Sequence, residues 1–566
     1  MALKVALGQE NFISLRSAGS YYVDKTELLY ELFSESDNAV TLFTRPRRFG
    51  KTLTMRMIES FFSMFVDQED ARTAYAGLDV MKHMEFCEKN MNQHPVIFIT
   101  LKDVEGLDFE SALGMMRHAI SDMCSEAYGL GDNENVDPYD KEQFMRLSGG
   151  RADVSDMKNS LKMLARMMYK AYGRKVIILI DEYDVPLAKA QANGYYREML
   201  DFIRGFMSTS LKTNDYLYKA VVTGCLRIPK ESIFTGVNNF ASYSVLDDRF
   251  SQYFGFTDQE VDRMLEAFGF SDKKKLIKKW YDGYHFGNSE VYCPWDVAYF
   301  LSDLLADRNA RPKNYWENTS GNTAIREFFN LEDSSVSEEF ETLLNGGTIT
   351  TTVTDALTYD NAYDSEENLW SILLMTGYVT TQGDFSNAQR KNGRLTAELR
   401  IPNMEVTDIF EAAVVDHFRR TADTDEIRNL MNSLWEGDTD TATDILSDLL
   451  WNTISYMDYG EDYYHAFLTG VFVGRGKYHV KSNKEQGEGR LDVEVRDRPN
   501  RRAFIIEAKV ADSREGMTAC CDQALAQIAD RGYDRDESFY GYRQIICYGV
   551  AFFKKEALVK KNSNSH

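Results

Sequence analysis

Apolar and polar residues alternate along the chain in patterns that separate two α/β segments from a mostly helical one. Between about residues 38 and 225, short apolar runs are separated by helical patterns. The runs are AVTLF (39–43), PVIFITL (95–101), KVIILI (175–180) and YKAVVT (218–223). Strands that are apolar on both faces and separated by helices are typical of a parallel sheet covered on both sides. We therefore predict a parallel sheet with flanking helices in this segment.

The remainder of the chain changes pattern twice. Residues 256–455 show mainly helical periodicity, although TITTTVTDALTY (348–359) favours β structure. From about residue 461 the pattern predicts a helix, two strands joined by a turn, a helix and a final strand near 544–552. The predicted fold class is α/β multidomain with a helical middle region. The predicted domains are 1–255, 256–455 and 456–566.

Composition restricts the class of protein. The 566 residues are 43% hydrophobic and 13% aromatic, which excludes a disordered or low-complexity chain. No apolar run approaches the roughly 18 residues of a membrane span, and the first residues become polar too early for a secretory signal. The 7 cysteines form no CxxC pair, which argues against a disulfide scaffold or a zinc ribbon. We expect a cytoplasmic protein without a membrane partner.

Charge is unevenly distributed along the chain. The formal net charge of −23 argues against non-specific coating of nucleic acid, because phosphate contacts need local Lys and Arg. Residues 41–60 nevertheless carry five basic residues and one acidic residue, and residues 471–510 carry ten basic and six acidic residues. These two segments can bind phosphates, although ordinary variation of surface charge is the alternative. The acidic segment 331–370 favours a protein partner.

The segment AVTLFTRPRRFGKTLTMRMIESFF combines a buried strand, a loop and a helix that begins at Lys51 and Thr52. This order suits a phosphate-binding loop, because loop N–H groups and the helix N-terminus face the phosphates. Lys51 would reach the β and γ oxygens, and the Thr52 hydroxyl would ligate Mg²⁺. The usual motif has glycine where this chain has Arg45. A basic turn between a strand and a helix is the alternative.

Two later strands end in polar residues that could serve the same site. The run KVIILID ends in Asp181, which can hold Mg²⁺ at the mouth of the sheet, and Glu182 can polarise the attacking water. The run YKAVVTG contains Thr223, a candidate sensor of the γ-phosphate, and Arg227 follows as a candidate clamp for its charge. An acidic turn, a loop threonine and a surface arginine are the alternatives.

These segments together resemble the AAA-ATPase-like family of P-loop ATPases. The likeness rests on YYVDKTELLYELF, RPRRFGKT, IDEYD and VTGCLRIPKESIFTGVNNF. Members of the family carry an RPRRFGK[ST] loop, so Arg45 agrees with the family pattern. The resemblance implies ATP as the nucleotide, bound by Arg45, Pro46, Arg47, Arg48, Phe49, Gly50, Lys51, Thr52 and Leu53. WYDGYHFGNSEVYCPWDV and NYWENTSGN also resemble the family, which assigns no role to WYDGY; aromatic packing in a core or lid is favoured.

The segment GEGRLDVEVRDRPNRRAFIIEAKV predicts a β-hairpin near the C-terminus. Strand alternation places Asp492 and Glu494 on one face of the first strand, and Glu507 and Lys509 on one face of the second. Pairing of the strands can bring Asp492 close to Glu507 and Lys509. Two carboxylates around a divalent ion beside an ammonium suit phosphodiester hydrolysis, since the ion lowers the pKa of a bound water and neutralises the phosphate. A structural hairpin with surface charges is the alternative.

Two predicted helices flank this hairpin. CDQALAQIADRGY places Gln523 and Gln527 four residues apart on one face, and EDYYHAFLTGVF begins with Glu461. With SNKEQGEGRLD and IIEAK, they resemble the PD-(D/E)XK nuclease superfamily, which implies a restriction-endonuclease-like α/β domain. The implied roles are Asp492 and Glu507 as metal ligands, Lys509 as catalytic lysine, Gln523 or Gln527 as the helix glutamine, and Glu461 as an additional acid.

The combined prediction is an ATP-regulated nucleic-acid enzyme that uses ATP and Mg²⁺, with DNA favoured over RNA. We expect ATP binding to reposition the helical middle region and so gate the metal site near Asp492, because the modules are fused in one chain. One alternative is a signalling or scaffold ATPase whose inactive nuclease-like domain binds a partner or nucleic acid. Another is a nucleotide switch that does not hydrolyse ATP. A protein partner or a homo-oligomer is compatible with each.

Overall fold

The chain folds into two compact units in the computed structural model. The first unit contains Met1–Trp316 and Thr350–Glu405, and the second contains Glu317–Ile349 and Val406–His566. The predicted three-domain division stays a prediction. The structure describes residues 3–34, 38–126, 129–212, 214–228, 233, 240–316, 339–340, 342–361, 364–383, 390–391, 394–421, 424–453, 461–472, 478–486, 489–532 and 540–562.

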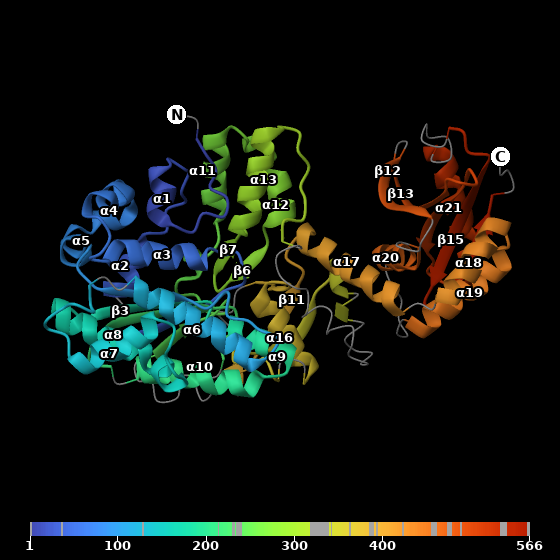
Figure 1. The fold of residues 1–566 in the computed structure, drawn as a ribbon. Helices are drawn as coiled ribbons and strands as arrows, with labels where there is room; N and C mark the ends of the chain where they lie inside the picture. Colours follow the sequence, from blue (N-terminus) through green and yellow to red (C-terminus); the bar gives the residue numbers. More distant parts are fainter. Residues whose placement is uncertain are drawn as a thin grey trace. The chain divides into compact units, whose positions relative to one another are not determined.

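A five-stranded parallel sheet organises the first unit (Figure 1). Its strands are β1 (Val40–Thr44), β2 (Val96–Thr100), β3 (Val176–Asp181), β4 (Leu217–Gly224) and β5 (Phe240–Tyr243). The order β2-β3-β4-β1-β5 places β4 between β1 and β3. Every residue of β1 and β3 is buried, which confirms the prediction of a sheet covered on both faces. The sequence pattern missed β5, whose residues are only half-buried.

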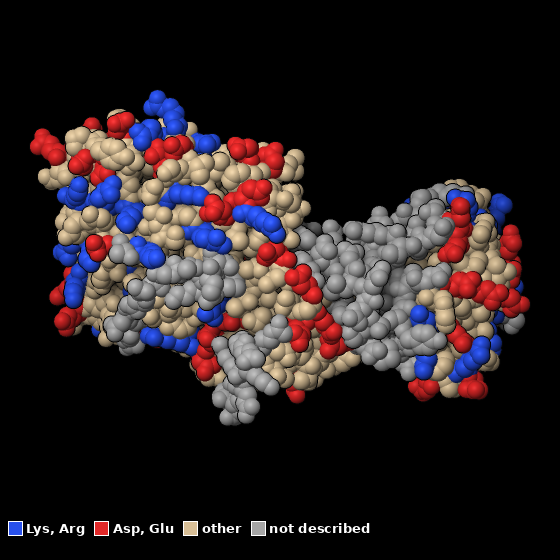
Figure 2. Space-filling model, turned by 90° about the horizontal axis from the view of Figure 1, so that it is seen from below, with Lys and Arg blue, Asp and Glu red and all other residues tan. Residues whose placement is uncertain are grey.

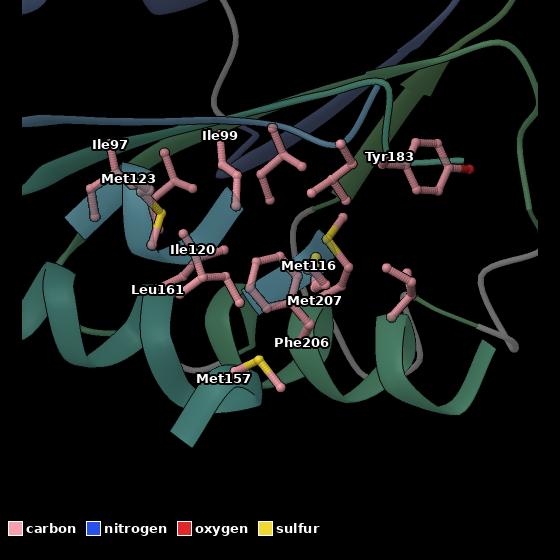
Figure 3. Close-up of a cluster of buried hydrophobic side chains, with 14 of the residues drawn as sticks. Ile97, Ile99, Met116, Ile120, Met123, Met157, Leu161, Tyr183, Phe206 and Met207 are labelled. Carbon is pink, nitrogen blue, oxygen red and sulfur yellow. The ribbon is translucent and has the colours of Figure 1, made fainter. Parts of the chain in front are cut away.

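Helices cover this sheet. They are α1 (Phe12–Ser17), α2 (Glu27–Ser34), α3 (Lys51–Phe62), α4 (Gln68–Tyr75), α5 (Met84–Asn90), α6 (Phe109–Ser125), α7 (Pro138–Ser148), α8 (Val154–Tyr172), α9 (Val185–Asn193) and α10 (Tyr196–Leu211). On one face, Met116, Leu161 and Phe206 from α6, α8 and α10 pack with Ile97 and Ile99 of β2 (Figure 3). On the other face, α3 contacts β2, β3 and β4. Each fully buried side chain of this kind contributes about 1.5–3 kcal/mol.

The chain then forms a smaller helical module within the first unit. It contains α11 (Asp258–Phe268), α12 (Lys274–Tyr281), β6 (Tyr284–Phe286), β7 (Ser289–Val291) and α13 (Pro294–Ala306). Its core includes Val261, Ile277 and Val297, and Val23 of the N-terminal segment packs into that core. The WYDGY motif therefore forms the end of α12 and the turn into β6, which agrees with the expected aromatic packing.

Further elements complete the middle of the chain. They are β8 (Ile349–Val353), α16 (Glu366–Thr376), β9 (Thr380–Thr381), β10 (Arg390–Lys391) and β11 (Arg394–Arg400). The sheet order is β10-β11-β8, and β9 pairs with β11. The presence of β8 confirms the β structure predicted within residues 348–359.

The second unit has a five-stranded mixed sheet with helices. Its elements are α17 (Met404–Thr421), α18 (Thr424–Glu436), α19 (Thr439–Thr453), α20 (Glu461–Phe472), β12 (His479–Gln486), β13 (Gly489–Asp497), β14 (Arg502–Val510), α21 (Met517–Arg531), β15 (Gln544–Phe553) and β16 (Glu556–Lys561). The strands follow chain order, and only β14 and β15 are parallel. The pair β13–β14 is the predicted hairpin. The prediction missed β12 and β16, because edge strands are rich in polar residues and carry a weak apolar pattern.

The surface carries mixed charge. In Figure 2, Lys and Arg side chains are interspersed with Asp and Glu on the visible face of each unit. The net charge of −23 therefore does not gather into one acidic surface on that face. None of the helices in the described part of the chain has the length and hydropathy needed to cross a membrane.

Candidate nucleotide and metal sites

The loop between β1 and α3 lies at the C-terminal edge of the parallel sheet. Gly50 caps α3 in the left-handed region at φ 80°, and Arg48 has φ 73°. Because Gly50 has no side chain to occupy the first N–H groups of α3, the helix N-terminus faces the loop and can attract an anion. The strand, loop and helix expected around Lys51 are therefore present.

Lys51 lies across this loop with its side chain buried. Its ammonium donates hydrogen bonds to the carbonyl oxygens of Arg45 and Pro46, each at 3.1 Å, and lies 3.2 Å from Oε1 of Glu182. Burial lowers the pKa of Lys51, but the neighbouring Cys225 thiol and the Glu182 carboxylate raise it, and the pKa ends above its ordinary value. The ammonium therefore keeps its positive charge at the mouth of the loop.

Asp181 connects three segments that lie far apart in the sequence. Its Oδ2 accepts a hydrogen bond from the Thr52 hydroxyl at 2.8 Å, and its Oδ1 accepts one from the Thr223 hydroxyl at 2.5 Å. Burial and the charge of Glu182 raise the pKa of Asp181, while the two hydroxyl groups act in the opposite direction. Carboxylate and hydroxyl oxygens are ligands that Mg²⁺ prefers, so Thr52 and Asp181 fit this ion.

Glu182 follows directly, in a strained backbone conformation. Its φ is 53°, and its backbone N–H donates to the Thr223 hydroxyl at 3.3 Å. Its Oε1 pairs with Lys51, whereas Oε2 is buried and accepts no hydrogen bond from the residues that the structure describes. The carboxylate thus keeps one acceptor oxygen that no described residue uses.

A cavity of about 340 Å³ adjoins the loop. Arg48, Lys51, Thr52 and Glu182 line one part of it. Aromatic and aliphatic residues line the rest, among them Tyr21, Phe256, Phe268, Trp295, Tyr299 and Leu301. Small-molecule sites commonly have this size and combine apolar walls with a few polar groups. The polar part suits phosphates, and the apolar part can accommodate a flat organic group.

The predicted nucleotide contacts divide into two groups. Those that line the cavity are Arg48, Phe49, Gly50, Lys51, Thr52 and Leu53, whereas Arg45, Pro46, Arg47, Asp181, Thr223 and Arg227 lie outside its lining. Arg45 is completely buried, donates to the carbonyl oxygens of Thr44 and Tyr243, and has its pKa lowered to about 10 by burial. Arg227 forms an ion pair with Asp355 at 2.8 Å.

One buried acid in this region was not identified from the sequence. Oδ2 of Asp184 accepts hydrogen bonds from the backbone N–H groups of Cys225 and Leu226 at 3.0 and 2.9 Å, and from the Tyr359 hydroxyl at 2.9 Å. Burial raises the pKa of Asp184. Its place within IDEYD was the available signal in the sequence, but its partners come from the turn after β4 and from Tyr359, a residue far along the chain. Asp184 ties the turn after β4 to the end of β3.

The C-terminal candidate residues come together on β13 and β14. Val493 pairs with Ile506, so Asp492 and Glu507 occupy the next positions across the two antiparallel strands. Oδ2 of Asp492 accepts a hydrogen bond from the Ala508 backbone N–H at 2.7 Å. The Lys509 ammonium lies 3.8 Å from Oε1 of Glu507, which is only 2% exposed. The hairpin therefore places two carboxyl groups and an ammonium together.

The helices contribute differently to this site. Gln527 donates a side-chain hydrogen bond to Glu507, whereas Gln523 is exposed one turn earlier on α21. Glu461 begins α20, but its side chain lies outside the described residues. His465 of α20, which no motif identified, contacts the backbone carbonyl of Asp492 at 3.1 Å.

The described residues contain no group of three or more His, Cys, Asp or Glu side chains with metal-site geometry. The C-terminal candidate site therefore depends on two carboxyl groups, Asp492 and Glu507. Their oxygens are the type of ligand that a divalent cation such as Mg²⁺ prefers, so the donor set fits that ion.

Comparisons with known proteins identify two domains. Residues 6–234 match the family model described as Predicted AAA-ATPase, and residues 459–562 match the PD-(D/E)XK nuclease superfamily. The chain is also 25% identical over 548 residues to the "Uncharacterized protein in vnfD 5′region" of Azotobacter chroococcum mcd 1, with 94% of this chain and 93% of that protein covered. The sequence resemblances are confirmed: the chain carries a predicted AAA-ATPase domain and a PD-(D/E)XK nuclease superfamily domain.

Proposed function

We propose that the first unit binds ATP with Mg²⁺ and hydrolyses it. The observation that carries this proposal is the convergence of Lys51, Thr52, Asp181 and Glu182 beside one cavity. Lys51 contacts the β- and γ-phosphates, and Thr52 and Asp181 hold the ion. A bound Mg²⁺ would neutralise part of the negative charge of the phosphates.

Glu182 is the residue we assign to the attacking water. Without nucleotide, its carboxylate pairs with the Lys51 ammonium at 3.2 Å. Phosphate oxygens compete for the same ammonium, so nucleotide binding releases Glu182 to accept a hydrogen bond from water. Thr223 lies between Asp181 and the Glu182 backbone, and it holds both in place. Arg227 is paired with Asp355, and a role as a phosphate clamp requires that pair to open.

We propose that the second unit cleaves nucleic acid, with DNA favoured over RNA, in a reaction that depends on a divalent cation. Asp492 and Glu507 hold the cation, which neutralises the scissile phosphate and lowers the pKa of a bound water. Lys509 lies beside Glu507 and orients or activates the nucleophile. Gln527 fixes the Glu507 carboxyl group through its hydrogen bond. We also propose a cytoplasmic location and ATP control of cleavage.

Two separate assays test these assignments. ATP turnover is measured in the parent and in Lys51→Ala, and we expect that variant to lose it. Plasmid nicking with Mg²⁺ or Mn²⁺ is measured in the parent, Glu507→Ala and Lys509→Ala, and we expect nicking only in the parent. Absence of nicking in the parent, with retained binding of nucleic acid or a protein, would instead establish the second unit as a binding module. The chain would then be a signalling or scaffold ATPase.

A further inference from the structure

Aromatic packing joins the loop between β1 and α3 to the module that carries WYDGYHFGNSEVYCPWDV. Phe49 of the loop lies against Tyr284 and Phe286, with ring centroids 4.9 Å apart in both pairs. The guanidinium carbon of Arg48 lies 3.8 Å from the centroid of the Trp295 ring. Trp295 lies in the first turn of α13, so this helix is in contact with the loop. The proposed catalytic steps give these aromatic residues no role.

Arg48 is the loop residue most directly affected by this packing. Its φ of 73° lies in the left-handed region, which favours glycine. Its side chain lines the cavity together with Lys51, and its NH1 group is buried with no hydrogen-bond acceptor among the described residues. Buried donors are nearly always paired, so an unpaired guanidinium donor beside an anion-binding loop points to an anionic ligand.

The indole of Trp295 can hold Arg48 without occupying its donors. Attraction between a cation and an aromatic face acts perpendicular to the guanidinium plane, whereas the N–H groups of arginine point outward within that plane. Arg48 can therefore stack on Trp295 and donate to a phosphate at the same time. Burial lowers the pKa of Arg48, whereas Cys293 and the buried carboxyl group of Asp296 act in the opposite direction.

We propose that Trp295 is a positioning residue for phosphate binding, and that it holds Arg48 in the orientation that contacts the nucleotide phosphates. The inference rests on the proposed function, because it takes the cavity as the ATP site. It assigns a role in phosphate binding to Trp295, which lies near the end of the segment WYDGYHFGNSEVYCPWDV. It also makes nucleotide binding depend on the position of α13.

A double-mutant cycle tests this link. Dissociation constants for MgATP, MgADP and AMP are measured by calorimetry for the parent, Trp295→Leu, Trp295→Phe, Arg48→Ala and Trp295→Leu/Arg48→Ala. We expect Trp295→Leu to weaken MgATP binding about tenfold, as for a desolvated cation–aromatic contact, and AMP binding less than about twofold. Trp295→Phe restores most of the affinity. In the Arg48→Ala background, Trp295→Leu has no further effect, because the partner is already absent.

Other outcomes separate the inference from the proposed function. If Trp295→Leu lowers the affinity for MgATP equally in the parent and in Arg48→Ala, the indole does not act through Arg48 and the proposed role is overturned. If Trp295→Leu lowers the affinities for MgATP and AMP equally, the indole contacts the nucleoside or only supports the fold, and the role is again overturned. A parent that binds none of the three nucleotides would defeat the proposed function and the inference with it. If Trp295→Leu does not fold, the cycle is run with Trp295→Met, which also lacks an aromatic face, and the same outcomes decide.

Discussion

Glu182, directly after β3, is held in the left-handed backbone region, which is unfavourable for a residue other than glycine. A non-glycine residue in the left-handed region costs about 1–3 kcal/mol, and its surroundings must offset that cost. Lys51 binds the side chain of Glu182 at 3.2 Å, and Thr223 binds its backbone N–H at 3.3 Å. Both partners also belong to the proposed nucleotide site. The strain is therefore maintained by the same groups that handle phosphate.

Replacing Glu182 by glutamine tests its assignment to the attacking water. Gln keeps the size of the side chain but removes the negative charge, so we expect ATP turnover to fall by about 10²–10⁴-fold. Affinity for MgATP should stay within a few-fold, because Lys51 and Thr52 are unchanged. Turnover and binding are measured separately, with Glu198→Gln, an exposed position on α10, as the control. Unchanged turnover in Glu182→Gln would remove its assignment to the attacking water, whereas binding of MgATP without turnover in the parent would favour a nucleotide switch that does not hydrolyse ATP.

The two glutamines of α21 provide a matched pair of variants. Gln527 donates to Glu507, and Gln523 is exposed on the same helix. Residues that orient a metal ligand typically contribute 10–100-fold to affinity or activity. We therefore expect Gln527→Ala to reduce plasmid nicking by about tenfold or more, with a higher Mg²⁺ requirement, and Gln523→Ala to behave as the parent. Similar nicking by the two variants would contradict the positioning role of Gln527.

At the scale of elements, a buried pair of carboxyl groups joins α13 to the start of α17. Asp296 and Glu405 are each at most 1% exposed, and both carboxyl oxygens of Asp296 and Oε2 of Glu405 have no hydrogen-bond partner among the described residues. A proton on one of the two carboxyl groups avoids burying two like charges side by side. Glu405 also accepts hydrogen bonds from the backbone N–H groups of Tyr315 and Trp316. These two hydrogen bonds fix Tyr315 and Trp316 to the start of α17. Helix packing at this junction thus depends on the protonation of two side chains.

This pair predicts a pH dependence of stability. Burial raises the pKa of Glu405 from 4.5 to about 10 and that of Asp296 from 3.8 to about 6. Because the folded state binds these protons more tightly than the unfolded state, the free energy of unfolding of the first unit falls as pH rises. Between pH 6 and 9, the Glu405 carboxyl group therefore contributes a decrease of at most about 1.4 kcal/mol per pH unit to the free energy of unfolding.

Calorimetric melting temperatures at pH 6, 7, 8 and 9 measure this effect. Glu405→Gln keeps an acceptor for the two N–H groups but cannot ionise, so we expect its melting temperature to depend less on pH than that of the parent. Glu290→Gln, at an exposed position of β7, is the control and should follow the parent. A parent and a Glu405→Gln variant with parallel pH profiles would argue against proton uptake at this pair.

At the scale of the whole molecule, the polypeptide passes between the two units after Trp316, Ile349 and Glu405, and the last of these crossings lies within α17. Glu405 is the last residue of the first unit, and the helix continues in the second unit from Val406. The first unit carries the proposed ATP site, and the second carries the site around Glu507. The presence of both sites in one chain is an associational argument that ATP binding and nicking are coupled. Because both activities can be assayed in the same protein, their coupling can be measured.

Nicking with and without ATP tests whether the units are coupled. In the parent we expect ATP to change the rate of metal-dependent nicking, because under the gating hypothesis nucleotide binding repositions the helical middle region. Lys51→Ala should retain the rate seen without ATP and should not respond to ATP. Glu507→Ala should lose nicking but keep ATP turnover within about twofold, since all residues assigned to ATP hydrolysis are unchanged in this variant. Equal nicking with and without ATP in the parent would remove the gating hypothesis.

Local patterns in the sequence determined the fold class and the two domain families of this protein. The loop before Lys51, the acids that end β3 and the alternation around Asp492 and Glu507 are local features, because hydrogen bonding within a strand or helix follows residue spacing. From these, the parallel sheet, the hairpin and both domain families could be predicted. Weakly apolar strands such as β12 and β16 could not.

Only the tertiary structure decided which side chains meet. Both Gln523 and Gln527 fit the helix pattern, but packing of α21 on the sheet turns Gln527 toward Glu507. The same holds for Arg48 and Trp295, whose contact depends on how α13 packs beside the loop. Such contacts join residues far apart along the chain, and their geometry is set by how whole elements fill space together, which residue spacing does not specify.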